Sequence, residues 1–287
     1  MRIDLHLGVH KTATTHLQRY WVACNPLGQA ARIHCPPLDE VRAELTPLAG
    51  VGDGHGVPQF KRAQAYLARL ASAHARVILS DENLIGTCEG NFAQGCLYPH
   101  AADRMANLTG ALQPFEVHLL ISVRRYSDYL RSAYCEAIRH SRYFTFESAI
   151  KRFQPEKRRW PAILRELRLA FPQSTLTCWP YEALHQVRGS MTSSLFELDI
   201  NRLPVASEER PRRTMSRLAI KLLDDIHSHA GAEVATAARA SVEKLVAGPK
   251  MVQFDPWTDE VRARLDALYE EDLLVLRSDP TLRFRHG

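Results

Sequence analysis

The sequence predicts an α/β fold, a three-layer sandwich in which a central parallel sheet lies between layers of helices. Strand-like segments alternate with segments of helical spacing over the first 180 residues, the order typical of a parallel sheet covered on both faces. The chain has 287 residues, 45% of them hydrophobic, so a sizeable core can form. Ligands of such sheets bind where strands end. Those ends are expected after Leu7, Leu79, Val123 and Trp179.

The expected strands and helices follow from the spacing of apolar residues and from the positions of Pro and Gly. Strands are expected at residues 2–7, 76–80, 116–123 and 174–179. Helices are expected after Thr15 and at residues 60–73, 101–112, 127–140 and 157–170. Segments 36–57 and 86–100 are rich in Pro or Gly and are expected to be irregular loops. Beyond residue 183 the pattern is mostly helical, and Asp255 followed by Pro256 marks the expected start of the last long helix.

We therefore expect one domain over residues 1–287, with its core in residues 1–185 and a helical portion in residues 186–287. The net charge of +5 and the pI of about 8.9 suit an anionic ligand. The basic runs are too short to predict nucleic-acid binding. No targeting segment and no apolar stretch of about 20 residues is visible, so a cytoplasmic location without a membrane span is expected.

Metal binding is not expected either. The six cysteines form no Cys-x-x-Cys pair and no zinc-spaced cluster with histidine, so reduced thiols, several of them buried, are predicted. His6 and His10 are four residues apart, but they straddle a strand end and a loop rather than one helical face.

The first strand leads into a loop of small and hydroxyl residues, Gly8 to Thr15. Backbone N–H groups can approach an anion closely there, and the start of the following helix adds positive partial charge. The loop is not a Walker A motif, because Lys11 comes early and Ala13 occupies a position where Gly is usual. ATP hydrolysis is therefore disfavoured, while a phosphate-type anion is expected.

The segment His-Lys-Thr-Ala-Thr-Thr-His-Leu-Gln, residues 10–18, resembles the 5′-phosphosulfate loop of the sulfotransferases that use 3′-phosphoadenosine-5′-phosphosulfate (PAPS). It is most similar to the bacterial pattern K-T-[GA]-T-T-x-L-Q. The resemblance implies a P-loop NTPase-like fold and PAPS as the co-substrate. It also implies that the donor's phosphosulfate contacts Lys11, Thr12, Ala13, Thr14 and Thr15.

Two further segments extend the resemblance over residues 2–185. Arg124 at a strand end and Ser132 eight residues later stand where family members hold the 3′-phosphate, although Tyr126 replaces the frequent proline. Trp-Pro-Tyr-Glu-Ala-Leu at residues 179–184 resembles a segment whose tyrosine, here Tyr181, lies near the adenine. Arg212 and Arg213 stand where some relatives supply further contacts to the 3′-phosphate, but the usual Arg-Lys-Gly sequence is absent.

Transfer to a hydroxyl requires a group that accepts its proton. Ser-Asp-Glu-Asn at residues 80–83 follows a strand, and Glu82 is the first candidate because family members use Glu or His as base. Asp81 could cap the next helix. His10 is the second candidate, and Glu82 could instead be only a cap or a partner of Lys11.

The sequence thus predicts in-line transfer of a sulfuryl group from PAPS to a hydroxyl or amine, releasing 3′,5′-ADP without a metal ion. Lys11 would stabilise charge on the bridging oxygen. The alternatives are a P-loop kinase-like phosphotransferase and a non-catalytic nucleotide-binding module. The acceptor could be a small molecule, a carbohydrate, a lipid or a peptide, and no oligomeric state is predicted.

Overall fold

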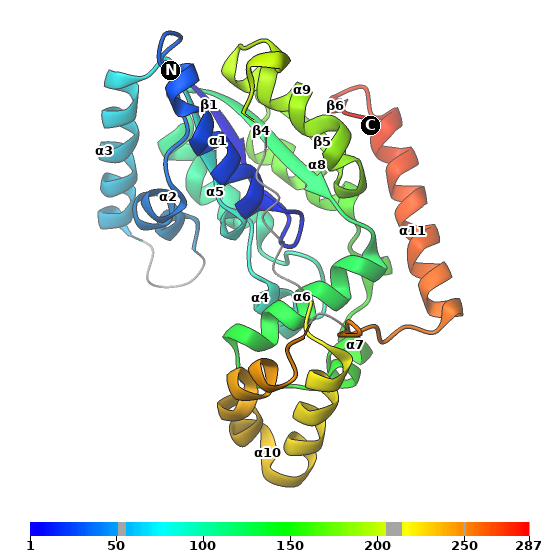
Figure 1. Ribbon diagram of the computed structural model, residues 1–287. Helices are drawn as coiled ribbons and strands as arrows, with labels where there is room; N and C mark the ends of the chain where they lie inside the picture. Colours follow the sequence, from blue (N-terminus) through cyan, green and yellow to red (C-terminus); the bar gives the residue numbers. More distant parts are fainter. Residues whose placement is uncertain (51–55, 205–213, 249–250, 287) are drawn as a thin grey trace.

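Six parallel strands form the centre of the protein. The computed structural model describes residues 1–50, 56–204, 214–248 and 251–286. The sheet has the order β2-β3-β1-β4-β5-β6, and every neighbouring pair is parallel. Helices lie on both of its faces (Figure 1). The predicted α/β sandwich is therefore confirmed. The strands are β1 (Arg2–His6), β2 (Ile33–His34), β3 (Arg76–Ser80), β4 (Glu116–Val123), β5 (Thr175–Pro180) and β6 (Leu282–Phe284).

The helices expected at residues 60–73, 101–112, 127–140 and 157–170 are present, each within about three residues of the predicted bounds. The helices of the described residues are α1 (Thr14–Gly28), α2 (Leu38–Glu44), α3 (Val57–Ala73), α4 (Cys88–Gln94), α5 (Ala101–Leu112), α6 (Tyr126–His140), α7 (Phe146–Arg152), α8 (Trp160–Ala170), α9 (Leu184–Phe196), α10 (Arg217–Leu245) and α11 (Asp259–Ser278). None of these helices is both long and apolar enough to cross a membrane. Gly231 breaks the helical dihedrals inside α10, and Figure 1 shows its two halves forming a hairpin beyond α6.

Two helices interrupt the segments that were expected to be irregular. In 36–57, α2 begins directly after Pro37, where a missing N–H costs nothing because the first helical N–H groups have no partner within the helix. In 86–100, Thr87 caps α4 by accepting a hydrogen bond from the Gly90 N–H, and Gly95 ends it in the left-handed conformation. The loop prediction was wrong for both because these Pro and Gly residues mark the ends of short helices.

The start of the last helix was also predicted wrongly. Thr258 is its N-cap and accepts a hydrogen bond from the Val261 N–H. Asp255 instead forms an ion pair with Arg262. The strands β2 and β6 were missed because two or three residues are too short to show a period.

The core is divided by the sheet into two clusters. One face carries Ile78, Leu120 and Trp179 and is covered by α1 and α9. The other carries Leu5, Leu119 and Ile121 and is covered mainly by α3, α5 and α8. This packing holds the carboxyl ends of β1, β3, β4 and β5 at one edge, where the predicted site residues follow.

Candidate functional site

The loop between β1 and α1 is tightly curled. Its backbone has positive φ at Gly8 (43°), Lys11 (68°) and Ala13 (61°), a conformation that residues other than glycine rarely adopt. The Thr12 hydroxyl donates to the Val9 carbonyl at 2.6 Å, and the Thr12 N–H donates to the same oxygen at 3.2 Å. Glycine is required at position 8, because a Cβ there would lie 2.4 Å from the Thr14 hydroxyl oxygen.

This loop, residues 8–13, leads directly into the N-terminus of α1, and we call it the phosphate loop after the role that the sequence predicts for it. No side chain in the described ranges caps that helix. The Thr14 hydroxyl is buried and has no hydrogen-bond partner among the described residues. Thr15, by contrast, is exposed. An anion seated over the loop could accept hydrogen bonds both from the helix N–H groups and from a buried hydroxyl of this kind.

Arg124 connects the phosphate loop to two other strand ends. It follows β4 directly, and its guanidinium donates to the carbonyl oxygen of Lys11. The same guanidinium lies over the ring of Tyr181, 4.6 Å from the ring centre. Tyr181 comes directly after β5. The loops after β1, β4 and β5 therefore meet at one cationic side chain.

The surroundings of Arg124 leave it able to bind an anion. Burial lowers the pKa of its guanidinium from the ordinary value, but an arginine remains charged at neutral pH. Its Nε atom is buried without a hydrogen-bond partner in the described parts of the chain. Ser132 is buried on α6, two turns after the start of that helix. Arg212 and Arg213 lie outside the described residues.

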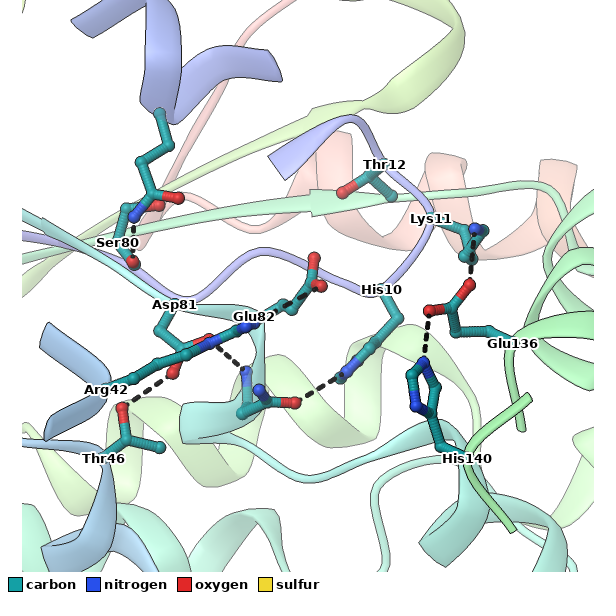
Figure 2. Close-up of polar contacts among 12 residues, drawn as sticks. His10, Lys11, Thr12, Arg42, Thr46, Ser80, Asp81, Glu82, Glu136 and His140 are labelled. Atoms are coloured by element: carbon teal, nitrogen blue, oxygen red, sulfur yellow. Dashed lines mark hydrogen bonds and ion pairs between the residues drawn. The ribbon is translucent and has the colours of Figure 1, made fainter. Parts of the chain in front are cut away.

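The two carboxylates after β3 have different environments (Figure 2). Asp81 is fully buried and caps a short 3-10 turn, Glu82–Leu84, by accepting from the Asn83 N–H. It also accepts from the Thr46 hydroxyl at 2.7 Å and from the Arg42 guanidinium. Glu82 is partly exposed, and its carboxylate lies 4.0 Å from Arg42. The capping role therefore belongs to Asp81, and Glu82 remains accessible.

Lys11 pairs with a carboxylate that the sequence analysis did not single out. Its ammonium lies 3.2 Å from Glu136 on α6, and both side chains are mostly buried. The other oxygen of Glu136 lies 3.2 Å from the ring of His140 (Figure 2). The only sequence signal was the position of Glu136, one helical turn after Ser132 and hence on the same face of α6.

The ring of His10 is buried and held by two polar contacts. Its ring contacts the Tyr98 hydroxyl through Nδ1 at 3.0 Å and the Asn83 side-chain oxygen through Nε2 at 3.1 Å. His6 instead contacts the Ser80 hydroxyl from inside the sheet core. In the described ranges, no group of three or more His, Cys, Asp or Glu side chains could hold a metal ion. All six cysteines are free thiols, five of them buried.

Comparisons with known proteins are sparse. No family model and no curated protein matches the chain. One similar solved structure is a sulfotransferase from Alicyclobacillus acidocaldarius. It is 18% identical, the match covers 83% of this chain and 94% of that one, and the TM-score is 0.41.

A cavity of about 340 Å³ lies beside the ion pairs of α6. Arg139 on its wall contacts Glu136, the partner of Lys11, and also pairs with Glu243 on α10. The remaining wall combines hydroxyl and apolar side chains: Thr214, Met215, Ser216, Ala247 and Met251. The cavity is thus linked to Lys11 through two charged side chains.

Proposed function

We propose that this protein transfers a sulfuryl group from PAPS to a hydroxyl or amine acceptor and releases 3′,5′-ADP. The observation that carries the proposal is the contact of Arg124 with both the Lys11 carbonyl and the Tyr181 ring. It brings together the three segments in which the sequence resembles a PAPS site. In that site the loop would hold the 5′-phosphosulfate, Arg124 and Ser132 the 3′-phosphate, and Tyr181 the adenine.

Two buried polar atoms support an anionic nucleotide. The Thr14 hydroxyl and the Arg124 Nε have no hydrogen-bond partner among the described residues, although unpaired buried polar groups are costly. The phosphate and sulfate oxygens of PAPS are strong acceptors that would satisfy such donors. A guanidinium is also suited to a phosphate because it offers several donors in one plane. Arg212 and Arg213 would add contacts from the C-terminal portion.

The proposed reaction is a single in-line displacement. The acceptor oxygen forms a bond to sulfur while the bond between sulfur and the bridging phosphate oxygen breaks. Glu82 takes the proton of the acceptor. Lys11 and the N–H groups of the phosphate loop stabilise the negative charge that grows on the bridging oxygen. Because these donors are held in place by the protein, the proposal includes no metal ion.

Glu82 is preferred over His10 as the base for a geometric reason. The Glu82 side chain is 22% exposed at a strand end beside the phosphate loop, so an acceptor could reach it. Both ring nitrogens of His10 are in hydrogen bonds, and the residue is 5% exposed. Figure 2 shows the Glu82 carboxylate beside the loop that carries His10 and Lys11. The Nε2 atom of His10 instead contacts the side-chain oxygen of Asn83.

A turnover assay with sulfur-labelled PAPS and a panel of alcohols, sugars, lipids, amines and peptides tests the proposal. We expect label transfer that persists in EDTA. Calorimetry should show that 3′,5′-ADP binds much more tightly than 5′-AMP, because only the former offers a 3′-phosphate to Arg124 and Ser132. Loss of activity in EDTA with recovery in Mg²⁺ and ATP would support a kinase instead. Tight 3′,5′-ADP binding without transfer to any acceptor would support a non-catalytic module.

A further inference from the structure

The phenol of Tyr98 contacts the phosphate loop through two atoms of His10. The backbone N–H of His10 donates to the Tyr98 oxygen at 2.9 Å. The Nδ1 atom of the His10 ring lies 3.0 Å from the same oxygen. Tyr98 is fully buried and His10 almost so. Both contacts therefore lie in a region where each donor and acceptor must be paired.

Tyr98 is itself held firmly in an unfavourable backbone conformation. Its φ is 42°, a strain that persists only where the surroundings impose it. Asn91 on α4 accepts the Tyr98 N–H at 2.8 Å and donates its amide to the Tyr129 hydroxyl at 2.8 Å. Tyr129 on α6 lies 3.2 Å from the Tyr98 hydroxyl. Asn91 thus holds the Tyr98 backbone, and the Tyr129 hydroxyl adds one further hydrogen bond to the phenol.

Counting protons decides the direction of each hydrogen bond. The Tyr129 oxygen accepts from Asn91, and in the described parts of the chain the Tyr98 oxygen is the acceptor within reach of the Tyr129 proton. The Tyr98 oxygen then accepts from both Tyr129 and the His10 N–H, which uses its two lone pairs. Among the described residues, the acceptor that remains for its own proton is the Nδ1 of His10. Burial raises the pKa of Tyr98 well above the ordinary value, so the phenol keeps this proton.

The ring proton of His10 must then be on Nε2, which faces the side-chain oxygen of Asn83. In this tautomer Nδ1 already accepts a proton from Tyr98 and Nε2 donates one to Asn83. Neither nitrogen has a free lone pair to offer an acceptor substrate. This arrangement is a second, independent reason for assigning the proton transfer to Glu82.

We infer that Tyr98 and His10 are positioning residues: Tyr98 binds the backbone and ring of His10 and thereby holds the phosphate loop in its anion-binding shape. The inference rests on the proposed function for the identity of the anion, the 5′-phosphate of the donor. His10 immediately precedes Lys11, whose φ of 68° requires support from its neighbours. Segment 86–100, which contains Tyr98, therefore supports the phosphate loop.

The test compares Tyr98→Phe with Tyr129→Phe, a matched control. Each removes one buried hydroxyl from the same cluster, but only Tyr98→Phe removes the two contacts with His10. Binding of 3′,5′-ADP and of adenosine 3′-phosphate is measured for both variants by calorimetry. The second ligand lacks the 5′-phosphate, so the ratio of the two affinities reports on the phosphate loop alone.

We expect Tyr98→Phe to lower that affinity ratio about tenfold, the effect of leaving a buried N–H unpaired. Tyr129→Phe should keep the wild-type ratio, even if it lowers the midpoint of urea unfolding as much as Tyr98→Phe does. A ratio unchanged in Tyr98→Phe would overturn the inference, as would an equal fall in both variants, which would indicate a general loss of packing.

Histidine-labelled protein provides a readout that needs no ligand. Long-range ¹H–¹⁵N spectra should show His10 with its proton on Nε2, and Tyr98→Phe should shift the Nδ1 signal. The signal is assigned by its absence in His10→Gln. A proton on Nδ1 in the wild type would refute the hydrogen-bond scheme. If the wild type binds no 3′,5′-ADP, the proposed function fails, and this spectrum still decides whether Tyr98 controls His10.

Discussion

Arg124 and Arg125 are adjacent in the chain but have different surroundings. Arg124 contacts the phosphate loop and Tyr181. The Arg125 guanidinium lies 3.8 Å from Asp266 and 3.9 Å from Glu270, both on α11. The backbone turn between β4 and α6 thus directs one arginine into the candidate site and the next towards the surface of a helix.

Replacing Arg124 by Ala should weaken 3′,5′-ADP binding by about 2–4 kcal/mol, because a charge-assisted contact away from water is lost. Replacing Arg125 by Ala is the matched control and should change the affinity little, since partly exposed ion pairs are worth less than about 1 kcal/mol. Calorimetry measures both. Equal losses in the two variants would contradict the assignment of Arg124 to the 3′-phosphate.

Lys11 and Glu82 should fail in different ways. Lys11→Ala should lower turnover by about 10²–10³-fold, because it acts on charge that develops in the transition state, with a smaller effect on 3′,5′-ADP binding. Glu82→Gln should leave nucleotide binding intact and lower turnover by about 10²–10⁴-fold, because the amide cannot accept the proton. Single-turnover assays and calorimetry separate the two effects.

Two outcomes would contradict the assignment of Glu82 as the base. Near-normal turnover in Glu82→Gln together with an inactive His10→Ala that still binds 3′,5′-ADP would make His10 the base. Activity in both variants would indicate an acceptor that loses its proton without help. In that case Glu82 would have no part in the chemistry.

At the scale of elements, the phosphate loop depends on one glycine. Gly8 has a φ of 43°, and a Cβ there would lie 2.4 Å from the Thr14 hydroxyl oxygen. Gly90 offers a contrast inside α4, because the nearest atom to its added Cβ is 3.4 Å away. Replacing each glycine by alanine therefore tests whether nucleotide binding depends on the shape of the phosphate loop.

Gly8→Ala should reduce 3′,5′-ADP affinity more than about tenfold, because the loop must move to relieve the clash and the strained φ. Gly90→Ala should leave binding unchanged and alter the free energy of unfolding by no more than about 1 kcal/mol, since alanine favours a helix. Binding isotherms and urea unfolding measure the two quantities. Full affinity in Gly8→Ala would show that the loop does not bind the nucleotide.

At the scale of the whole molecule, the face of the sheet under α1 and α9 contains buried polar groups. Asp4 on β1 pairs with Arg76 on β3 and with His118 on β4. Burial by itself would raise the pKa of Asp4, but hydrogen bonds from His118 and Arg76 lower it overall. His6 lies fully buried against Trp21 and Trp179, and burial lowers its pKa to about 3.

His6 should therefore make folding sensitive to mild acid. The unfolded chain binds a proton near pH 6.5 and the folded chain only near pH 3, so stability is full above pH 6.5 and is lost as pH falls. The contribution is about 1.4 kcal/mol per pH unit in that window. Urea unfolding at pH 7, 6 and 5 should show a shallower decline in the free energy of unfolding for His6→Phe, which keeps an aromatic ring but cannot titrate. Identical slopes would contradict the assignment.

Much of the fold followed from the sequence because its signals are local. The strands β3 and β4 and the helix α5 have the bounds that their periodicity predicted, since side-chain direction repeats every 2 or 3.6 residues. The order of strand, loop and helix also located the ends where Lys11, Glu82 and Arg124 lie. Short elements such as α2 and α4 were missed because one or two turns give too few repeats.

The sequence alone thus determined the parallel sheet and the strand ends, and it predicted an anion site at the first loop. Only the tertiary structure decided which side chains meet there. Glu136 lies 125 residues from Lys11, and Tyr98 lies 88 residues from His10. No local pattern encodes such pairs, because they depend on how α6 and segment 88–98 pack beside β1. The partners of the phosphate loop are therefore a property of the packing, whereas the loop itself is a property of consecutive residues.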